Sequence, residues 1–123
     1  LPDRLHRWRL AAGSGKKRLT ARCRWHFGGG PEYCAACAGE CPDCPYLAHE
    51  PLSFEGWQVW DVTLRCAGQL RLVPGAAIGI DLNACFGMGA GLGYDPTALA
   101  ELLPAAEAGT VAGFNERMKS DGR

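Results

Sequence analysis

The residues best suited to chemistry are four cysteines that lie close together in the first half of the chain. Cys34, Cys37, Cys41 and Cys44 form two Cys-x-x-Cys pairs. Two such pairs supply the tetrahedral thiolate set that zinc prefers. The three residues between the pairs are fewer than the roughly 15–20 typical of zinc ribbons, and His49 is a candidate substitute for one cysteine. The sequence therefore predicts a zinc site.

Other states of these thiols stay open. An iron–sulfur cluster is one alternative, although the bacterial ferredoxin spacing is Cys-x2-Cys-x2-Cys-x3-Cys-Pro and the order here differs. Unliganded or redox-labile thiols are another. A disulfide framework is not expected in a cytoplasmic chain. Cys66 and Cys85 fall on segments predicted to be helical, where we expect them to be small buried apolar residues.

No combination of residues predicts an enzyme. The three histidines, His6, His26 and His49, all precede the segments predicted to form the helical body. No Ser/His/Asp or Cys/His arrangement can therefore be argued. The glycines around Lys16 lack the full phosphate-loop pattern. We expect a protein without catalytic residues.

Charge is distributed unevenly along the chain. The formal net charge is zero, yet residues 1–30 contain eight basic residues and one acidic residue, so the remainder carries the opposite charge. A basic segment can bind nucleic acid by neutralising phosphates. Glycine, serine and scattered charges are also typical of a disordered leader. We expect residues 1–30 to be a flexible basic arm, and we do not expect nucleic acid to be the partner.

The elements that would position these residues are helical. Ser53 is a candidate N-cap, and apolar residues recur after it at spacings of three and four until about Ala67. Residues 68–79 are predicted to be extended or turn-like, with a reversal at Pro74-Gly75. Asp81 caps a second predicted helix. Asp95-Pro96 begins a third, which is expected to break or kink at Pro104.

The predicted fold is mostly α. It is a small bundle of three to four short helices over residues 53–119, preceded by a cysteine-rich metal-binding loop over 31–52 and the flexible arm over 1–30. Trp57 and Trp60 lie three residues apart, and we expect both in the core. The remaining candidates are Gln69, Arg71 and Asp81, at the two ends of the connection between the first two helices. They either fix that connection or meet a partner.

From Gly56 to Met118 the chain resembles small phage and prophage tail assembly chaperones, specifically the downstream partner made by translational frameshift. The resemblance covers about half of the chain. It rests on Trp57 and Trp60, Gly68–Arg71, Gly79–Leu82, Gly93–Asp95 and Leu102–Gly109. The cysteines at 34–44 depart from the family pattern.

The resemblance implies a function in the cytoplasm of a bacterial host cell. The family binds the tape-measure protein and helps the tail tube polymerise around it. The chain begins with Leu1, which fits frameshifted expression, and no apolar run approaches the roughly 18–20 residues of a membrane span. The alternative is a small zinc-dependent module that binds nucleic acid or has a regulatory role.

Overall fold

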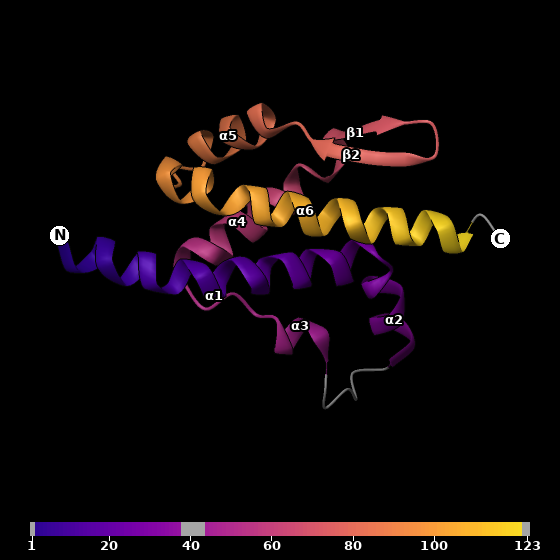
Figure 1. Cartoon of the computed structure of the whole chain (residues 1–123), viewed down its shortest axis with the longest axis horizontal. Coiled ribbons are helices and arrows are strands. Elements are labelled where there is room, and N and C mark those ends of the chain that lie inside the picture. Colours follow the sequence, from indigo (N-terminus) through magenta and orange to yellow (C-terminus); the bar gives the residue numbers. More distant parts are fainter. Residues whose placement is uncertain (1, 38–43, 122–123) are drawn as a thin grey trace.

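A computed structural model describes residues 2–37 and 44–121, and the fold is mostly helical, as the sequence predicts (Figure 1). The described elements are α1 (Pro2–Phe27), α2 (Gly30–Cys37), α3 (Pro45–Ala48), α4 (Phe54–Arg65), a 3-10 turn (Ala67–Gln69), β1 (Leu70–Val73), β2 (Ala76–Ile80), α5 (Leu82–Gly91) and α6 (Pro96–Asp121). The helices are more numerous than predicted, and α1 and α6 have 26 residues each.

The prediction of a flexible arm is wrong, because α1 packs along α6 and runs in the same direction (Figure 1). Leu19 and Cys23 on α1 are fully buried, and Phe27 packs against the core. These three residues are four apart, so they lie on one face of the helix. The face is narrow and has basic residues on both sides, which is why the segment resembles a solvated leader in the sequence.

Small residues allow α1 and α6 to approach closely. A Cβ atom on Gly109 would lie 2.2 Å from the Thr20 carbonyl oxygen, and one on Gly113 would lie 2.3 Å from the Arg24 carbonyl oxygen. Real Cβ contacts are never so short, so glycine is required at both positions. The Thr20 hydroxyl donates a hydrogen bond of 3.0 Å to the Ala105 carbonyl. Ala105, Gly109 and Gly113, each four residues apart, thus line the side of α6 that contacts α1, and we call them the glycine seam.

The basic residues of α1 face acidic residues of α6, which explains the uneven charge of the sequence. These ion pairs are exposed, so they contribute little to stability, but they favour one alignment of the two helices. A further pair joins α6 to α2. The pairs are Lys16–Glu101 at 2.6 Å, Arg24–Glu116, and Arg117–Glu32 at 2.7 Å.

The two strands form an antiparallel hairpin that lies on α6 (Figure 1). Gly75 has a φ of +82° in the turn, at the predicted reversal. The Asn115 side chain accepts a hydrogen bond from the Ala77 N–H at 2.7 Å and donates one to the Ala77 carbonyl at 3.0 Å. The Glu107 carboxylate accepts the Ile80 N–H at 2.9 Å. Side chains of α6 therefore pair with this edge of β2 as a third strand would.

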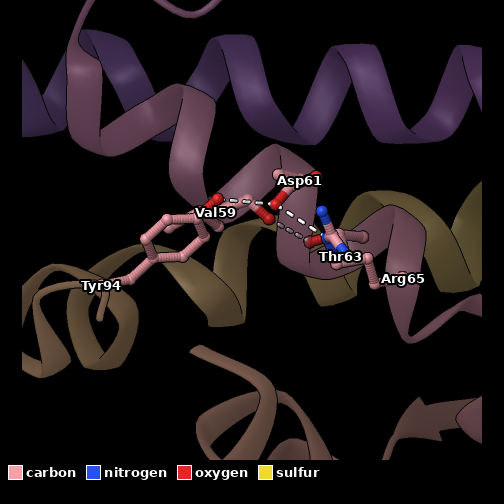
Figure 2. A network of polar contacts seen from close by, with 5 residues as sticks. All are labelled: Val59, Asp61, Thr63, Arg65 and Tyr94. Atoms are coloured by element: carbon pink, nitrogen blue, oxygen red, sulfur yellow. Dashed lines mark hydrogen bonds and ion pairs between the residues drawn. The ribbon is translucent and has the colours of Figure 1, made fainter. Parts of the chain in front are cut away.

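A polar network joins α4 to the loop that follows α5 (Figure 2). The Tyr94 hydroxyl donates to the Asp61 carboxylate at 2.7 Å, and Arg65 Nε donates to the same oxygen at 3.0 Å. The hydrogen bond to Asp61 raises the pKa of Tyr94. On the same helix, the buried Thr63 hydroxyl donates to the carbonyl of Val59, one turn earlier, at 2.8 Å. The network fixes α5 and the start of α6 against α4.

The predicted break at Pro104 does not occur, and α6 continues from Pro96 to Asp121. Proline removes the hydrogen bond that its N–H would donate to the carbonyl of Ala100. Pro104 and Ala100 are both exposed, so water can solvate that carbonyl. Packing against α1 and α4 stabilises the helix on either side. No helix in the described part of the chain is long and apolar enough to cross a membrane.

Candidate partner-binding site

Trp57 and Trp60 surround a buried arginine. The guanidinium carbon of Arg22 lies 4.5 Å from the ring centroid of Trp60, 5.0 Å from that of Tyr46 and 5.2 Å from that of Trp57. Arg22 is 8% exposed, and its Nη1 donates to the Tyr46 carbonyl. Burial lowers the pKa of Arg22. The cluster connects α1 to α3 and α4, so the N-terminal helix belongs to the same core as the body.

The two tryptophans differ in burial. Trp60 is 7% exposed and belongs to the core, as predicted. Trp57 is 42% exposed, so the prediction that it lies in the core is wrong. Its ring lies beside the Arg22 guanidinium but remains partly open to solvent. The contact of both tryptophans with Arg22 was not predicted, because residues 1–30 were expected to be a flexible arm.

Gln69, Arg71 and Asp81 are brought together where the hairpin joins α5. The Asp81 N–H donates to the Gln69 carbonyl at 2.9 Å, and the Asp81 carboxylate accepts the Ala84 N–H at 3.2 Å as the N-cap of α5. Arg71 Nη2 lies 3.9 Å from the same carboxylate. These contacts close the connection between the 3-10 turn and α5, which is the structural role of the three residues.

The cysteine segment is described only at its two ends. The thiols of Cys34 and Cys44 are in contact, and burial, followed by the neighbouring Cys44, raises the pKa of Cys34. Cys37 is disulfide-bonded, which was not expected. Cys41 lies outside the described residues. Among the side chains that the structure describes, those of residues 15–37 and 44–121, no group of three His, Cys, Asp or Glu could hold a metal ion.

The other cysteines are packed in the core. Cys66 and Cys85 are buried against each other, as the sequence predicts. Burial, with the contact to Cys66, raises the pKa of Cys85 to about 12. Burial also raises the pKa of Cys23 to about 12. Thiols in this state are poor nucleophiles and poor metal ligands.

An open groove of about 810 Å³ lies beside the second half of α1. Its walls come from α1, from the turn into α2, from the residue that follows α3 and from α6. His49, proposed above as a spare metal ligand, lies here. The lining residues are Lys16, Lys17, Thr20, Ala21, Arg24, Trp25, Gly28, Gly29, Gly30, Tyr33, His49 and Glu116.

Two aromatic rings form the apolar part of this groove. The rings of Trp25 and Tyr33 meet edge to face with centroids 5.7 Å apart, and Trp25 also meets Tyr46 at 4.8 Å. A Cβ atom on Gly30 would lie 2.0 Å from the Trp25 ring, so glycine at this position lets the ring fill the turn. Gly29, with a φ of +117°, provides the reversal into α2. Trp25 is therefore held rigidly, while Tyr33 is 59% exposed.

A second apolar surface lies on the hairpin. Leu72 is 60% exposed and Ile78 is 62% exposed, although both lie on strands. Val73, beside the turn, is also exposed. In Figure 1, α1 and the hairpin lie on opposite sides of α6, and the groove is lined mostly by residues of α1.

The chain is similar to one described family over part of its length. A family model, described as a family of unknown function (DUF7697), matches residues 72–123, which extend from the middle of β1 through α6. No curated protein and no solved structure matches the chain. The matched segment includes most of the hairpin and the glycine seam, whereas most of the groove-lining residues lie before it.

Proposed function

We propose that the protein is a phage tail assembly chaperone that binds the tape-measure protein while the tail tube assembles. The proposal rests on the resemblance of residues 56–118 to the downstream, frameshift-made chaperones. The observation that carries it is the open groove beside α1, which combines a fixed aromatic ring with an exposed one. Exposed apolar surface on a small protein commonly marks a binding site for another protein.

The shape of this groove suits a temporary complex. A tape-measure protein is a long helical chain, and its apolar stripes would be exposed before the tube encloses it. A groove that is open on one side covers such a stripe only in part, so tube subunits can displace the chaperone. The rigid scaffold of α1 and α6 keeps the groove formed before the partner arrives, which lowers the entropic cost of binding.

The proposal includes zinc at the cysteine segment. Cys34 and Cys44 are already in contact and would supply two thiolates. Cys37 would contribute after reduction of its disulfide, because a thiolate is the metal ligand. Zinc would tie the end of α2 to the start of α3, and it would thereby support the wall of the groove that carries Tyr33 and His49.

A nucleic-acid-binding module is the second candidate, and the fold weakens its main support. Lys16 and Arg24 are paired with acidic residues of α6. Arg22 is buried among aromatic rings. Arg18 donates to the carbonyls of Ala48 and Glu50, both at 3.2 Å. These four basic residues therefore have roles within the fold that do not require phosphate.

Co-expression tests the proposed function. The tagged full chain is expressed together with a tape-measure protein encoded in the same genome, and bound protein is recovered by pull-down in buffer of moderate salt. We expect the tape-measure protein to co-purify with the chain. Addition of tail tube protein should then dissociate the complex. If the tape-measure protein stays in the unbound fraction while the chain is folded, the proposed function is wrong.

A further inference from the structure

We propose that Cys34 and Cys44 are a reversible dithiol, which exchanges with low-molecular-weight disulfides and closes into a disulfide that ties α2 to α3. The two cysteines are free thiols, they are half-buried, and they are in contact. In a reducing compartment, such pairs commonly act as redox sensors. The disulfide uses two sulfur atoms of the proposed zinc site, so its effect on zinc rests on the proposed function, whereas its formation does not.

One tryptophan ring holds together the two backbone segments that carry these cysteines. The ring of Trp25 on α1 meets the ring of Tyr33, the residue before Cys34, with centroids 5.7 Å apart. It also meets the ring of Tyr46, two residues after Cys44, at 4.8 Å. Both segments are therefore packed on the same fixed residue of α1. The thiols stay close without a bond between them, so a disulfide requires little movement of the backbone.

Accessibility distinguishes this pair from a second pair of thiols. Cys66 and Cys85 are also in contact, but they are 2% and 0% exposed. Disulfide exchange requires the reagent to reach a sulfur atom, so a buried pair cannot react until the core opens. Cys34 and Cys44 are only half-buried, which leaves them open to a small reagent. The chain thus contains a reactive pair and a matched unreactive pair.

The exchange balances in two steps. The thiolate of one cysteine attacks a small disulfide, RSSR, forms a mixed disulfide with one RS group and releases the other group as RS⁻. The thiolate of the second cysteine attacks the protein sulfur of the mixed disulfide, which forms the Cys34–Cys44 bond and releases the second RS⁻. The protons that the two cysteines lose to solvent are taken up by the two RS⁻ ions. The protein sulfur atoms are oxidised, and RSSR is reduced to two thiols.

The disulfide restrains one wall of the groove. Cys34 follows Tyr33 on α2, Cys44 directly precedes α3, and His49 directly follows α3. Tyr33 and His49 both line the groove. A covalent tie between α2 and α3 limits how far these two residues can separate. Sulfur atoms joined in a disulfide are also no longer thiolate ligands for zinc.

Alkylation of the full chain tests the inference. The protein is equilibrated with buffers of increasing ratio of oxidised to reduced glutathione at about pH 8, where thiolates form. Free thiols are then alkylated in denaturant, the disulfides are reduced, and the released thiols receive an isotopically heavy label that tandem mass spectrometry locates. We expect Cys34 and Cys44 to lose free thiol together, while Cys66 and Cys85 stay free. Cys34 and Cys44 that remain free in oxidised glutathione alone, or that each retain a bound glutathione, would overturn the inference.

Variants separate the two steps. Cys34→Ser lacks one thiol of the pair, so Cys44 should stop at the mixed disulfide and gain the mass of one glutathione. Cys66→Ser is the matched control, because it alters the buried pair, and it should form the Cys34–Cys44 bond as the wild type does. If Cys44 instead forms a protein disulfide in Cys34→Ser at the same glutathione ratio as in the wild type, Cys34 is not its partner and the inference is wrong.

This result is separable from the proposed function. If the reduced chain contains no zinc but still forms the Cys34–Cys44 bond, the inference stands and the zinc of the proposed function is wrong. If the tape-measure protein co-purifies with a chain whose Cys34 and Cys44 do not oxidise, the chaperone function stands and the inference is wrong.

Discussion

Gly109 on α6 touches the backbone of Thr20 on α1, so that a Cβ atom at position 109 would lie 2.2 Å from the Thr20 carbonyl oxygen. The two residues are far apart in the sequence, and their contact sets the distance between the two longest helices. Because α1 lines most of the groove, the shape of the groove depends on this contact. The N-terminal helix is therefore part of the scaffold.

Gly109→Ala should destabilise the protein by about 1–3 kcal/mol, because the methyl group forces the helices apart. Gly91→Ala is the control, since nothing lies within 4 Å of a Cβ atom there. That change should raise stability by at most about 1 kcal/mol, through lower entropy of the unfolded chain. Urea unfolding followed by circular dichroism measures both. Equal stability of the two variants would show that the seam is not tightly packed.

A chain that begins at Pro31 should lose cooperative folding. It lacks the buried side chains of Leu19 and Cys23, and it exposes the glycine seam of α6. Thermal unfolding by circular dichroism, compared with the full chain, is the measurement. A sharp transition in the shortened chain would mean that residues 53–121 form a core without α1.

Trp60→Ala should cost about 3–5 kcal/mol, because the ring is buried between Arg22 and the core. Trp57→Ala should cost only about 1–2 kcal/mol, since its ring is partly exposed and its main contact is with the Arg22 guanidinium. Chemical unfolding of the two variants gives the difference. A larger loss for Trp57→Ala would reverse the assignment of the core residue.

Stability should fall as the pH is lowered below about 6.5, the ordinary pKa of histidine. Burial of His26, followed by the charge of Arg22, lowers its pKa, although Glu32 acts in the opposite direction. The unfolded chain then binds a proton that the folded chain disfavours, so stability is present at neutral pH and is lost in acid. His26 Nδ1 is also 2.7 Å from the Tyr46 hydroxyl.

The measurement for His26 is Tm between pH 7.5 and pH 5.0, for wild type and His26→Phe. The phenylalanine variant should show a smaller loss in acid. Parallel curves for the two proteins would show that His26 does not contribute to the pH dependence.

Reduced protein, purified without added metal, should contain one zinc per chain. Cys34→Ser should abolish the zinc, whereas Cys66→Ser should retain it, because Cys66 is in the core beside Cys85. Elemental analysis gives the stoichiometry. A reduced wild-type protein without zinc, with Cys34 and Cys44 reacting freely with a thiol reagent, would exclude the metal site.

The local elements of the body were predictable from the sequence, since their signals are local. The Ser53 hydroxyl accepts the Gly56 N–H at 3.0 Å at the start of α4, and Asp81 caps α5. The reversal of the chain at Gly75 follows from the Pro74-Gly75 dipeptide, which favours a turn. Each of these depends on residues that are close in sequence, and each needs no knowledge of tertiary contacts.

The groove and α1 were not predictable in the same way. The fully buried apolar residues of α1 are only Leu19 and Cys23. The helix is stabilised by its close packing against α6 at Gly109. Glycines inside a helix lower its predicted stability when they are considered alone. Trp25 and Tyr33 stood in segments expected to be an arm and a loop, so their contact had no local signal.

Hydrogen exchange of the complex with the tape-measure protein tests the central claim most directly, that the groove beside α1 holds the partner. Amide exchange is followed by mass spectrometry for the full chain, alone and in the complex. We predict slower exchange over residues 16–33 and around His49 in the complex, with the hairpin at residues 70–80 unchanged. A complex that protects the hairpin and leaves residues 16–33 unchanged would contradict the account.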